Sequence, residues 1–227
     1  MIKVGILDAS GASETPAALS LLSEKERERI GKIKNGKRRS ESFFSRLLLK
    51  KMYEETFGEE IPEIIYTSKG KPSFKGKKIS FSISHDDNLI AVAISDETES
   101  IGIDIQSFVG KSRKSDGLEK RFLSGLDSLK GESREDFKIY ISFFTKEEKD
   151  GDFEIKEREP FENLSYDKNN ENLYFLKRWT ELEACLKLSG KGFENIKNAN
   201  KCLQKCKIKT LFFKNRGREY SLTVANE

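Results

Sequence analysis

Two separated patches of the sequence carry the residues best suited to metal and phosphate chemistry. Residues 101–106 have the apolar pattern of a strand, interrupted by the carboxylate of Asp104. Residues 179–187 place Glu183 and Lys187 four positions apart, so both lie on one face of a helix. Mg²⁺ prefers oxygen ligands and is usually held by one or two carboxylates together with substrate phosphates. A lysine can neutralise a phosphate oxygen as charge moves. The pattern predicts a magnesium–pyrophosphate site in a phosphoryl-group transferase.

Each of these residues also has a structural interpretation. A carboxylate buried at Asp104 needs a partner, and that partner could be a metal, several donors or a lysine in an ordinary salt bridge. Glutamate is common on solvated helix faces, and a surface pair of Glu183 with Lys187 contributes only ~0.3–0.5 kcal/mol. The residues alone leave both interpretations open.

The only histidine of the chain, His85, stands at the end of an expected strand and beside an Asp-Asp-Asn turn. An imidazole in this place can donate to a phosphate or hold a metal-bound water, or it can simply bond to Asp87. Residues 70–72 form a Gly-Lys-Pro turn that can present a backbone amide and a lysine to an anion.

Composition narrows the class of protein without deciding it. The formal net charge is +4 and the mean hydropathy is −0.64, and no apolar run approaches the ~20 residues that span a bilayer. Basic residues cluster at 32–39 and 69–78, which suits an anionic ligand or an acidic partner, although solvated lysines explain them equally well. No signal peptide is visible at the N-terminus, so we expect a cytoplasmic protein. Three cysteines without framework spacing predict free thiols, and with one histidine they argue against a zinc site.

The periodicity of apolar residues predicts an α+β fold. We expect a first strand at 1–9, followed by helices at 19–34, where Ser23 and Glu26 form a capping box, and at 40–57. Strands at 79–84, 89–95 and 101–105 are expected to form an antiparallel meander. Further along, the pattern predicts a short helix near 118–129, a helix start at 143–148 with Thr145 as N-cap, a mobile loop at 151–172, a long helix at 173–188 and a final hairpin at 208–225.

In combination these segments resemble a known family. The motifs are TSKGKP at 67–72, FSISHD at 81–86, AVAIS at 91–95, IGIDIQ at 101–106 and WTELEACLKLSGKGF at 179–193. Their order, spacing and residue types are similar to those of the Sfp-type 4′-phosphopantetheinyl transferases, or holo-acyl-carrier-protein synthases. The resemblance implies two similar sheet-plus-helix halves with the active site in the cleft between them. Residues 1–100 would carry the coenzyme A binding elements, and residues 101–227 the metal and catalytic residues.

The resemblance also implies a role for each matching residue. Asp104 and Glu183 would bind Mg²⁺, with Gln106 as a third metal position, and Glu183, Lys187 and His85 would be catalytic. The residues implied to bind coenzyme A are Lys37 or a neighbouring arginine, Lys69, Gly70, Lys71, Pro72, Ser84, His85 and Lys187.

The implied reaction moves 4′-phosphopantetheine from coenzyme A to a serine of an apo acyl or peptidyl carrier protein. Glu183 is our candidate base, with a metal-bound hydroxide as the alternative. Many relatives have glutamate where this chain has Gln106, so a catalytically impaired family member is one alternative. A basic nucleic-acid-binding protein is another. The sequence leaves open whether the carrier belongs to fatty-acid, polyketide or peptide synthesis, and we expect a monomer.

Overall fold

The computed structural model describes residues 1–11, 13–107, 138–149, 152–167, 170–190, 203 and 205–227. Within these ranges the chain is a mixed α+β protein, as the sequence predicted. The elements run in the order β1 (Ile2–Asp8), α1 (Pro16–Ser20), α2 (Glu24–Gly31), α3 (Gly36–Phe57), β2 (Ile64–Tyr66), β3 (Pro72–Phe74), β4 (Ser80–Asp86), β5 (Leu89–Ser95), β6 (Ile101–Ser107), β7 (Ile139–Lys149), β8 (Asp152–Arg158), β9 (Glu162–Asn163), α5 (Glu171–Ser189), β10 (Lys207–Asn215) and β11 (Arg218–Asn226). No helix in the described ranges is long and apolar enough to cross a membrane.

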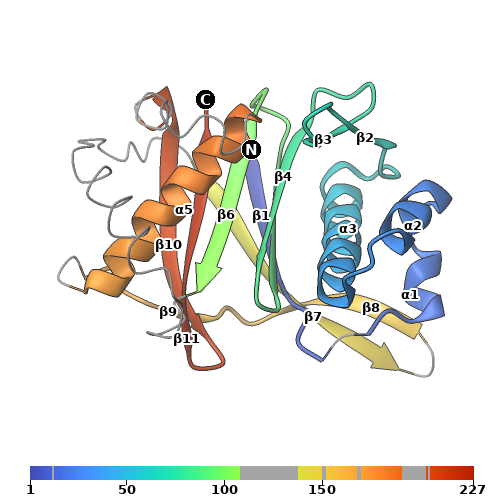
Figure 1. The fold of residues 1–227 in the computed structure, drawn as a ribbon, viewed down its shortest axis with the longest axis horizontal. Coiled ribbons are helices and arrows are strands. Elements are labelled where there is room, and N and C mark those ends of the chain that lie inside the picture. The colour runs from blue at the N-terminus through green and yellow to red at the C-terminus, as the bar shows by residue number, and fades with distance from the viewer. Residues whose placement is uncertain (12, 108–137, 150–151, 168–169, 191–202, 204) are drawn as a thin grey trace.

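Two sheets form the centre of the molecule. One has the strand order β4-β5-β1-β7-β8, and the other has the order β6-β11-β10-β9. Apolar side chains of β1 and β5 pack against those of β6 and β11 in one shared core between the sheets. Helix α3 covers the outer face of the first sheet through a second core, and α5 packs on β6 and β11. Figure 1 shows the strands between α5 on one side and α3 on the other.

Local signals set the bounds of α3. The Asn35 side chain accepts a hydrogen bond from the Arg38 N–H and caps the first turn. Gly58 ends the helix with φ of 67°, the left-handed conformation that glycine adopts without strain. The expected start at residue 40 is therefore four residues late, because the asparagine cap begins the helix at Gly36. Ser23 caps α2 as predicted, its hydroxyl accepting from the Glu26 N–H at 3.3 Å.

The expected meander of three consecutive strands is wrong. β4 and β5 do form an antiparallel hairpin, but β5 pairs next with β1. β6 crosses to the second sheet and pairs with β11. The side chains of β6 at 101, 103 and 105 are apolar and are buried in the core between the sheets. β6 therefore buries its apolar side chains there without β5 as a neighbour.

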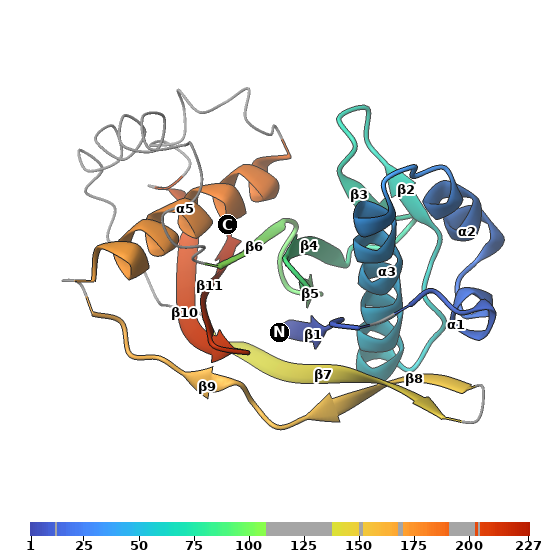
Figure 2. The same ribbon diagram turned by 60° about the horizontal axis from the view of Figure 1, so that its bottom comes forward.

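Two expectations for the second part of the chain are also wrong. Residues 143–148 lie within β7, which pairs in parallel with β1, and are not the start of a helix. The segment predicted as a mobile loop at 151–172 includes β8 and β9. Figure 2 shows β7 and β8 running beneath α3 and β1, where they complete the first sheet. The helix expected near 118–129 falls outside the described residues.

Helix α5 approaches β6 closely at Gly102. A Cβ placed on Gly102 would lie 1.9 Å from the Ala184 carbonyl oxygen and 2.7 Å from the Leu188 backbone nitrogen. Real contacts of this kind do not occur below 3.0 Å, and neither backbone atom can move without moving the helix. Gly102 therefore fixes the depth at which α5 sits on the sheet.

We expect Gly102→Ala to lower the free energy of unfolding by about 3 kcal/mol, the upper part of the range for overpacking a rigid interior. Urea denaturation of the purified protein measures the change. Gly31→Ala is the matched control, because nothing lies within 4 Å of a Cβ at that helical position. It should leave stability unchanged or raise it by up to about 1 kcal/mol. Equal stability of the two variants would contradict this account of the α5–β6 contact.

Candidate functional site

The edge strands β4 and β6 are joined by side chains and not by a backbone ladder. Every second side chain of β4 accepts a hydrogen bond from every second backbone N–H of β6. The pairs are Ser82 with Ile103 at 3.1 Å, Ser84 with Ile105 at 3.3 Å, and Asp86 with Ser107 at 2.6 Å. This junction fixes β6, and therefore the acidic residue between these positions, against the first sheet.

Asp104 lies at that junction with only 5% of its surface exposed. Its Oδ1 accepts hydrogen bonds from the Ser84 hydroxyl at 2.8 Å and from the Lys187 ammonium at 2.7 Å. Its Oδ2 is buried and meets no hydrogen-bond donor in the described part of the chain. Burial raises the pKa of Asp104, and Lys187 and Ser84 partly offset that effect.

Helix α5 supplies the second carboxylate, Glu183. Burial, together with the negative charge of Asp104, raises the pKa of Glu183 to about 7, and Lys187 acts in the opposite direction. The ion pair that the structure shows for Lys187 joins it to Asp104 and not to Glu183 one turn away. The surface pair of Glu183 with Lys187, one of the two interpretations of the sequence, is therefore wrong, and Lys187 instead joins α5 to β6.

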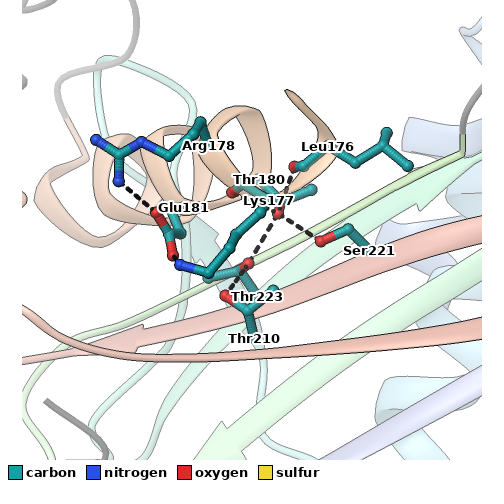
Figure 3. Close-up of polar contacts among 8 residues, drawn as sticks. All are labelled: Leu176, Lys177, Arg178, Thr180, Glu181, Thr210, Ser221 and Thr223. Atoms are coloured by element: carbon teal, nitrogen blue, oxygen red, sulfur yellow. Dashed lines mark hydrogen bonds and ion pairs between the residues drawn. The ribbon is translucent and has the colours of Figure 1, made fainter. Parts of the chain in front are cut away.

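A cluster of hydroxyls holds α5 in the orientation that this contact requires. The Thr180 hydroxyl lies 2.9 Å from that of Ser221 and 2.8 Å from that of Thr223, both on β11 (Figure 3). One residue further along α5, Glu181 is buried and bonds to Lys177 and Arg178. Because Thr180 faces the sheet, Glu183 and Lys187 are turned toward β6 and β4. Sequence analysis did not single out this cluster, whose only signal is small polar residues at alternate positions of an apolar strand.

A cavity of about 380 Å³ gathers most of the predicted site residues. The turn at 69–72 lines it, together with His85, Glu183 and Lys187. Ser84 does not line it but contacts the lining residue Lys187, from which it accepts at 2.7 Å, and it donates to Asp104. Segments far apart in the sequence thus meet around a single cavity that is rich in cationic groups.

Helix α3 contributes lining residues that sequence analysis missed. They are Arg38, Ser42, Ser45 and Arg46. The spacing of three or four residues between them could have revealed a polar stripe opposite the apolar face of the helix. Arg46 is also committed to a buried ion pair with Glu26 at 2.7 Å. Arg38 is the arginine of this stripe that lies nearest the start of the helix.

Two predicted coenzyme A ligands lie in less direct positions. Lys37 lines a separate, smaller cavity and stands 3.8 Å from Glu41. Lys71 lines the main cavity, but its ammonium donates to the Leu188 carbonyl at 2.8 Å and to Ser100 at 3.2 Å. It therefore ties the 67–72 turn to the last turn of α5, where a cation is favoured by the helix dipole.

The donor set fits a hard divalent cation. Asp104 offers its buried Oδ2, which has no donor among the described residues. Glu183 is close enough for the negative charge of Asp104 to raise its pKa. Gln106 follows on the same face of β6, two residues from Asp104. Among the described residues no three His, Cys, Asp or Glu side chains come together, so phosphate or water oxygens would complete the shell. Two of the three cysteines predicted as thiols, Cys185 and Cys206, are buried, and Cys202 lies outside the described residues.

Comparison with known proteins identifies the class of protein that this arrangement belongs to. Residues 10–97 match the family described as 4′-phosphopantetheinyl transferase, N-terminal. The match spans less than half of the 227 residues, and it supports the assignment to the 4′-phosphopantetheinyl transferases that the motifs predicted, as well as a transferase enzyme of this type. No curated protein sequence matches the chain.

The raised pKa of Glu183 predicts how stability depends on pH in metal-free protein. The folded state binds the Glu183 proton more tightly than the unfolded state, whose carboxyl titrates near 4.5. Stability is therefore fully retained below about pH 4.5 and falls as the pH rises through about 7. Glu183→Gln removes this loss, so near pH 8 the variant should exceed the parent by about 1–2 kcal/mol, after allowance for partial exposure.

Near pH 5 the same two proteins should differ little, and this pH dependence separates the charge effect from a change in packing. Chemical denaturation with a chelator present measures both differences. Glu157→Gln, at an exposed position of β8, is the control and should show no pH-dependent difference. A Glu183→Gln variant that is no more stable than its parent near pH 8 would show that the carboxylate is not repelled in the folded protein.

Proposed function

We propose that this enzyme transfers 4′-phosphopantetheine from coenzyme A to a serine hydroxyl of an apo acyl or peptidyl carrier protein in a Mg²⁺-dependent reaction. The observation that carries the proposal is the pairing of the buried Asp104 on β6 with Lys187 on α5, which lines one cavity together with Glu183. The 69–72 turn and His85 line the same space. Enzymes of this family use coenzyme A and generally a divalent metal, and the donor set described above fits both.

The bond changes follow from the substrates. The serine oxygen attacks the phosphorus that carries pantetheine, and the pyrophosphate P–O bond breaks. Adenosine 3′,5′-bisphosphate leaves, and holo-carrier protein is the second product. Glu183, which faces the cavity, takes the serine proton, while Lys187 and His85 stabilise the phosphate oxygens. Mg²⁺ held by Asp104 and Glu183, with Gln106 beside them, would neutralise charge on the pyrophosphate.

The arrangement of the sheets supports the rest of the proposal. The two sheet-plus-helix units would be the two halves of the family fold, with the site between β4 and β6. The coenzyme A binding elements would lie within residues 1–100 and the metal and catalytic residues within 101–227, although β7 and β8 complete the first sheet. We propose that the enzyme acts as a monomer in the cytoplasm.

Magnesium-dependent labelling of an apo-carrier protein with a fluorescent coenzyme A analogue tests this function directly. We expect label on the carrier only when Mg²⁺ is present. Glu183→Gln should lower turnover about 100-fold or more, the scale of a lost acid–base group. Asp104→Asn should lower it and raise the Mg²⁺ concentration needed, because a buried anionic ligand is removed. Glu157→Gln is again the control. Near-normal turnover of Glu183→Gln would rule out Glu183 as the base, and a carrier left unlabelled by the parent enzyme would overturn the function.

The placement of Arg38 and Lys37 predicts a difference between adjacent cations. Arg38 lines the main cavity and Lys37 lines the smaller one, so we propose Arg38 as the arginine that contacts a coenzyme A phosphate. Losing one charge-assisted hydrogen bond costs about 1.5–3 kcal/mol, so Arg38→Gln should raise the KM for coenzyme A roughly 10- to 100-fold. Lys37→Gln is the matched control and should change it less than about threefold. Steady-state kinetics at saturating carrier measure both values, and a larger effect at Lys37 would reverse the assignment.

A further inference from the structure

His85 and Glu41 are neighbours that line different cavities near the N-terminal turns of α3. His85 lines the main cavity with Glu183 and Lys187, whereas Glu41 lines the smaller cavity. The imidazole Nδ1 of His85 is 3.4 Å from Oε2 of Glu41, and the Glu41 side chain is only 12% exposed. The histidine therefore has a nearly buried carboxylate behind it.

The position of Glu41 is fixed by α3. The helix begins at Gly36 under the Asn35 cap, and Glu41 lies in its second turn. The Glu41 backbone carbonyl accepts a hydrogen bond from the Ser45 hydroxyl. The second oxygen of the Glu41 carboxylate, Oε1, lies 3.8 Å from the Lys37 ammonium. The carboxylate is thus placed between one lysine and one histidine, where it can favour the charged form of the histidine.

The charged groups around His85 come from three elements. Glu41 and Lys37 belong to α3, Asp86 belongs to β4, and Lys187 belongs to α5. Partial burial lowers the pKa of His85 and is the largest influence, Glu41 and Asp86 raise it, and Lys187 and Lys37 lower it further. Glu41 is the strongest of the influences that keep a proton on the ring.

We propose that Glu41 is a positioning residue for His85. Its carboxylate, 3.4 Å from Nδ1, favours a proton on that nitrogen, which restrains the ring and leaves Nε2 for the main cavity. A neutral imidazole protonated at Nδ1 can only accept through Nε2, whereas the imidazolium can donate there to a phosphate oxygen. By opposing the effect of burial, Glu41 lets His85 take up a proton and donate through Nε2 more readily when an anionic ligand is present. The identity of that ligand as a phosphate of coenzyme A rests on the function proposed above.

Because His85 is the only histidine of the chain, its NMR signals can be assigned without mutagenesis. We expect the imidazole signals of ligand-free and metal-free protein to titrate about 1 unit lower in Glu41→Gln than in the parent. The neutral ring of the parent should carry its proton on Nδ1, which ¹⁵N chemical shifts report. Glu41→Asp should retain part of the effect. Loss of folding in any variant would be visible as random-coil histidine shifts.

Glu54→Gln is the matched control for this titration. Glu54 lies on the same helix and pairs with Lys50, away from His85, so the pKa of His85 should not change in this variant. An unchanged pKa in Glu41→Gln, or a neutral parent ring protonated at Nε2, would overturn the proposal.

Binding of adenosine 3′,5′-bisphosphate, measured by calorimetry across the pH range, separates the two levels of the proposal. Affinity of the parent should fall as His85 loses its proton, and in Glu41→Gln this fall should occur about 1 unit lower, matching the NMR titration. At a pH between the two midpoints the variant should bind up to about tenfold more weakly. If the NMR shift occurs but the nucleotide does not bind to the parent, the phosphate role and the proposed function fail while the Glu41–His85 pair stands. If the nucleotide binds with the same pH dependence in both proteins, Glu41 does not act through His85.

Discussion

The burial of Asp104 is the constraint on which the rest of this structure depends. A carboxylate in an apolar strand is costly unless it is paired and hydrogen-bonded. Here the pairing comes from two different directions, Ser84 on β4 and Lys187 on α5, and both reach the same oxygen. Three elements must therefore be held in register for one side chain to be tolerated. The site exists because the fold satisfies this requirement on one side of the carboxylate and leaves the other oxygen without a donor among the described residues.

The junction of β4 with β6 shows how that register is kept. An exposed strand edge usually pairs with another backbone, and β6 has such a partner, β11, on one side only. On its other side the backbone N–H groups are satisfied by side-chain oxygens of β4. These side-chain bonds join the two sheets at the edge of the core that they share. Close packing at Gly102 on β6 and hydroxyl contacts of Thr180 with β11 then seat α5 on the second sheet.

Much of this could be predicted from the sequence, for identifiable reasons. Glycine and polar caps mark helix ends locally, so the bounds of α5 and the end of α3 at Gly58 were close to those observed. Strand partners are not local. Residues 101–105 alternate in a way that suits any neighbour, and only the shared core between the sheets selects β11 in place of β5. Thr145 followed by two glutamates is a pattern that predicts a helix start. In the folded protein this local preference is overridden, because the same residues pair with β1 as part of β7.

The candidate site follows the same division. Asp104, Glu183 and Lys187 could be selected by residue type and spacing, but which of the two carboxylates the lysine pairs with depends on the crossing of α5 over β6. Arg38 and Glu41 lie on a helix whose sequence gave no sign of which face would meet β4. The polar stripe of α3 acquires meaning only when His85 is placed beside it.

The position of Lys187 determines how the negative charges of Asp104 and Glu183 are balanced. The Lys187 ammonium lies 2.7 Å from the Asp104 carboxylate, and it partly offsets the burial and the negative charge of Asp104 that raise the pKa of Glu183. A divalent cation at these carboxylates would compete with that ammonium for the same negative charge. In the proposed function, a bound pyrophosphate would remove this conflict, because Lys187 could donate to its oxygens while Asp104 and Glu183 hold the cation. Two carboxylates and one lysine are therefore better matched to a metal together with its phosphate ligand than to either one alone. If Gln106 contributes to the proposed metal site, its uncharged amide would leave more of the negative charge to be supplied by the phosphate ligand.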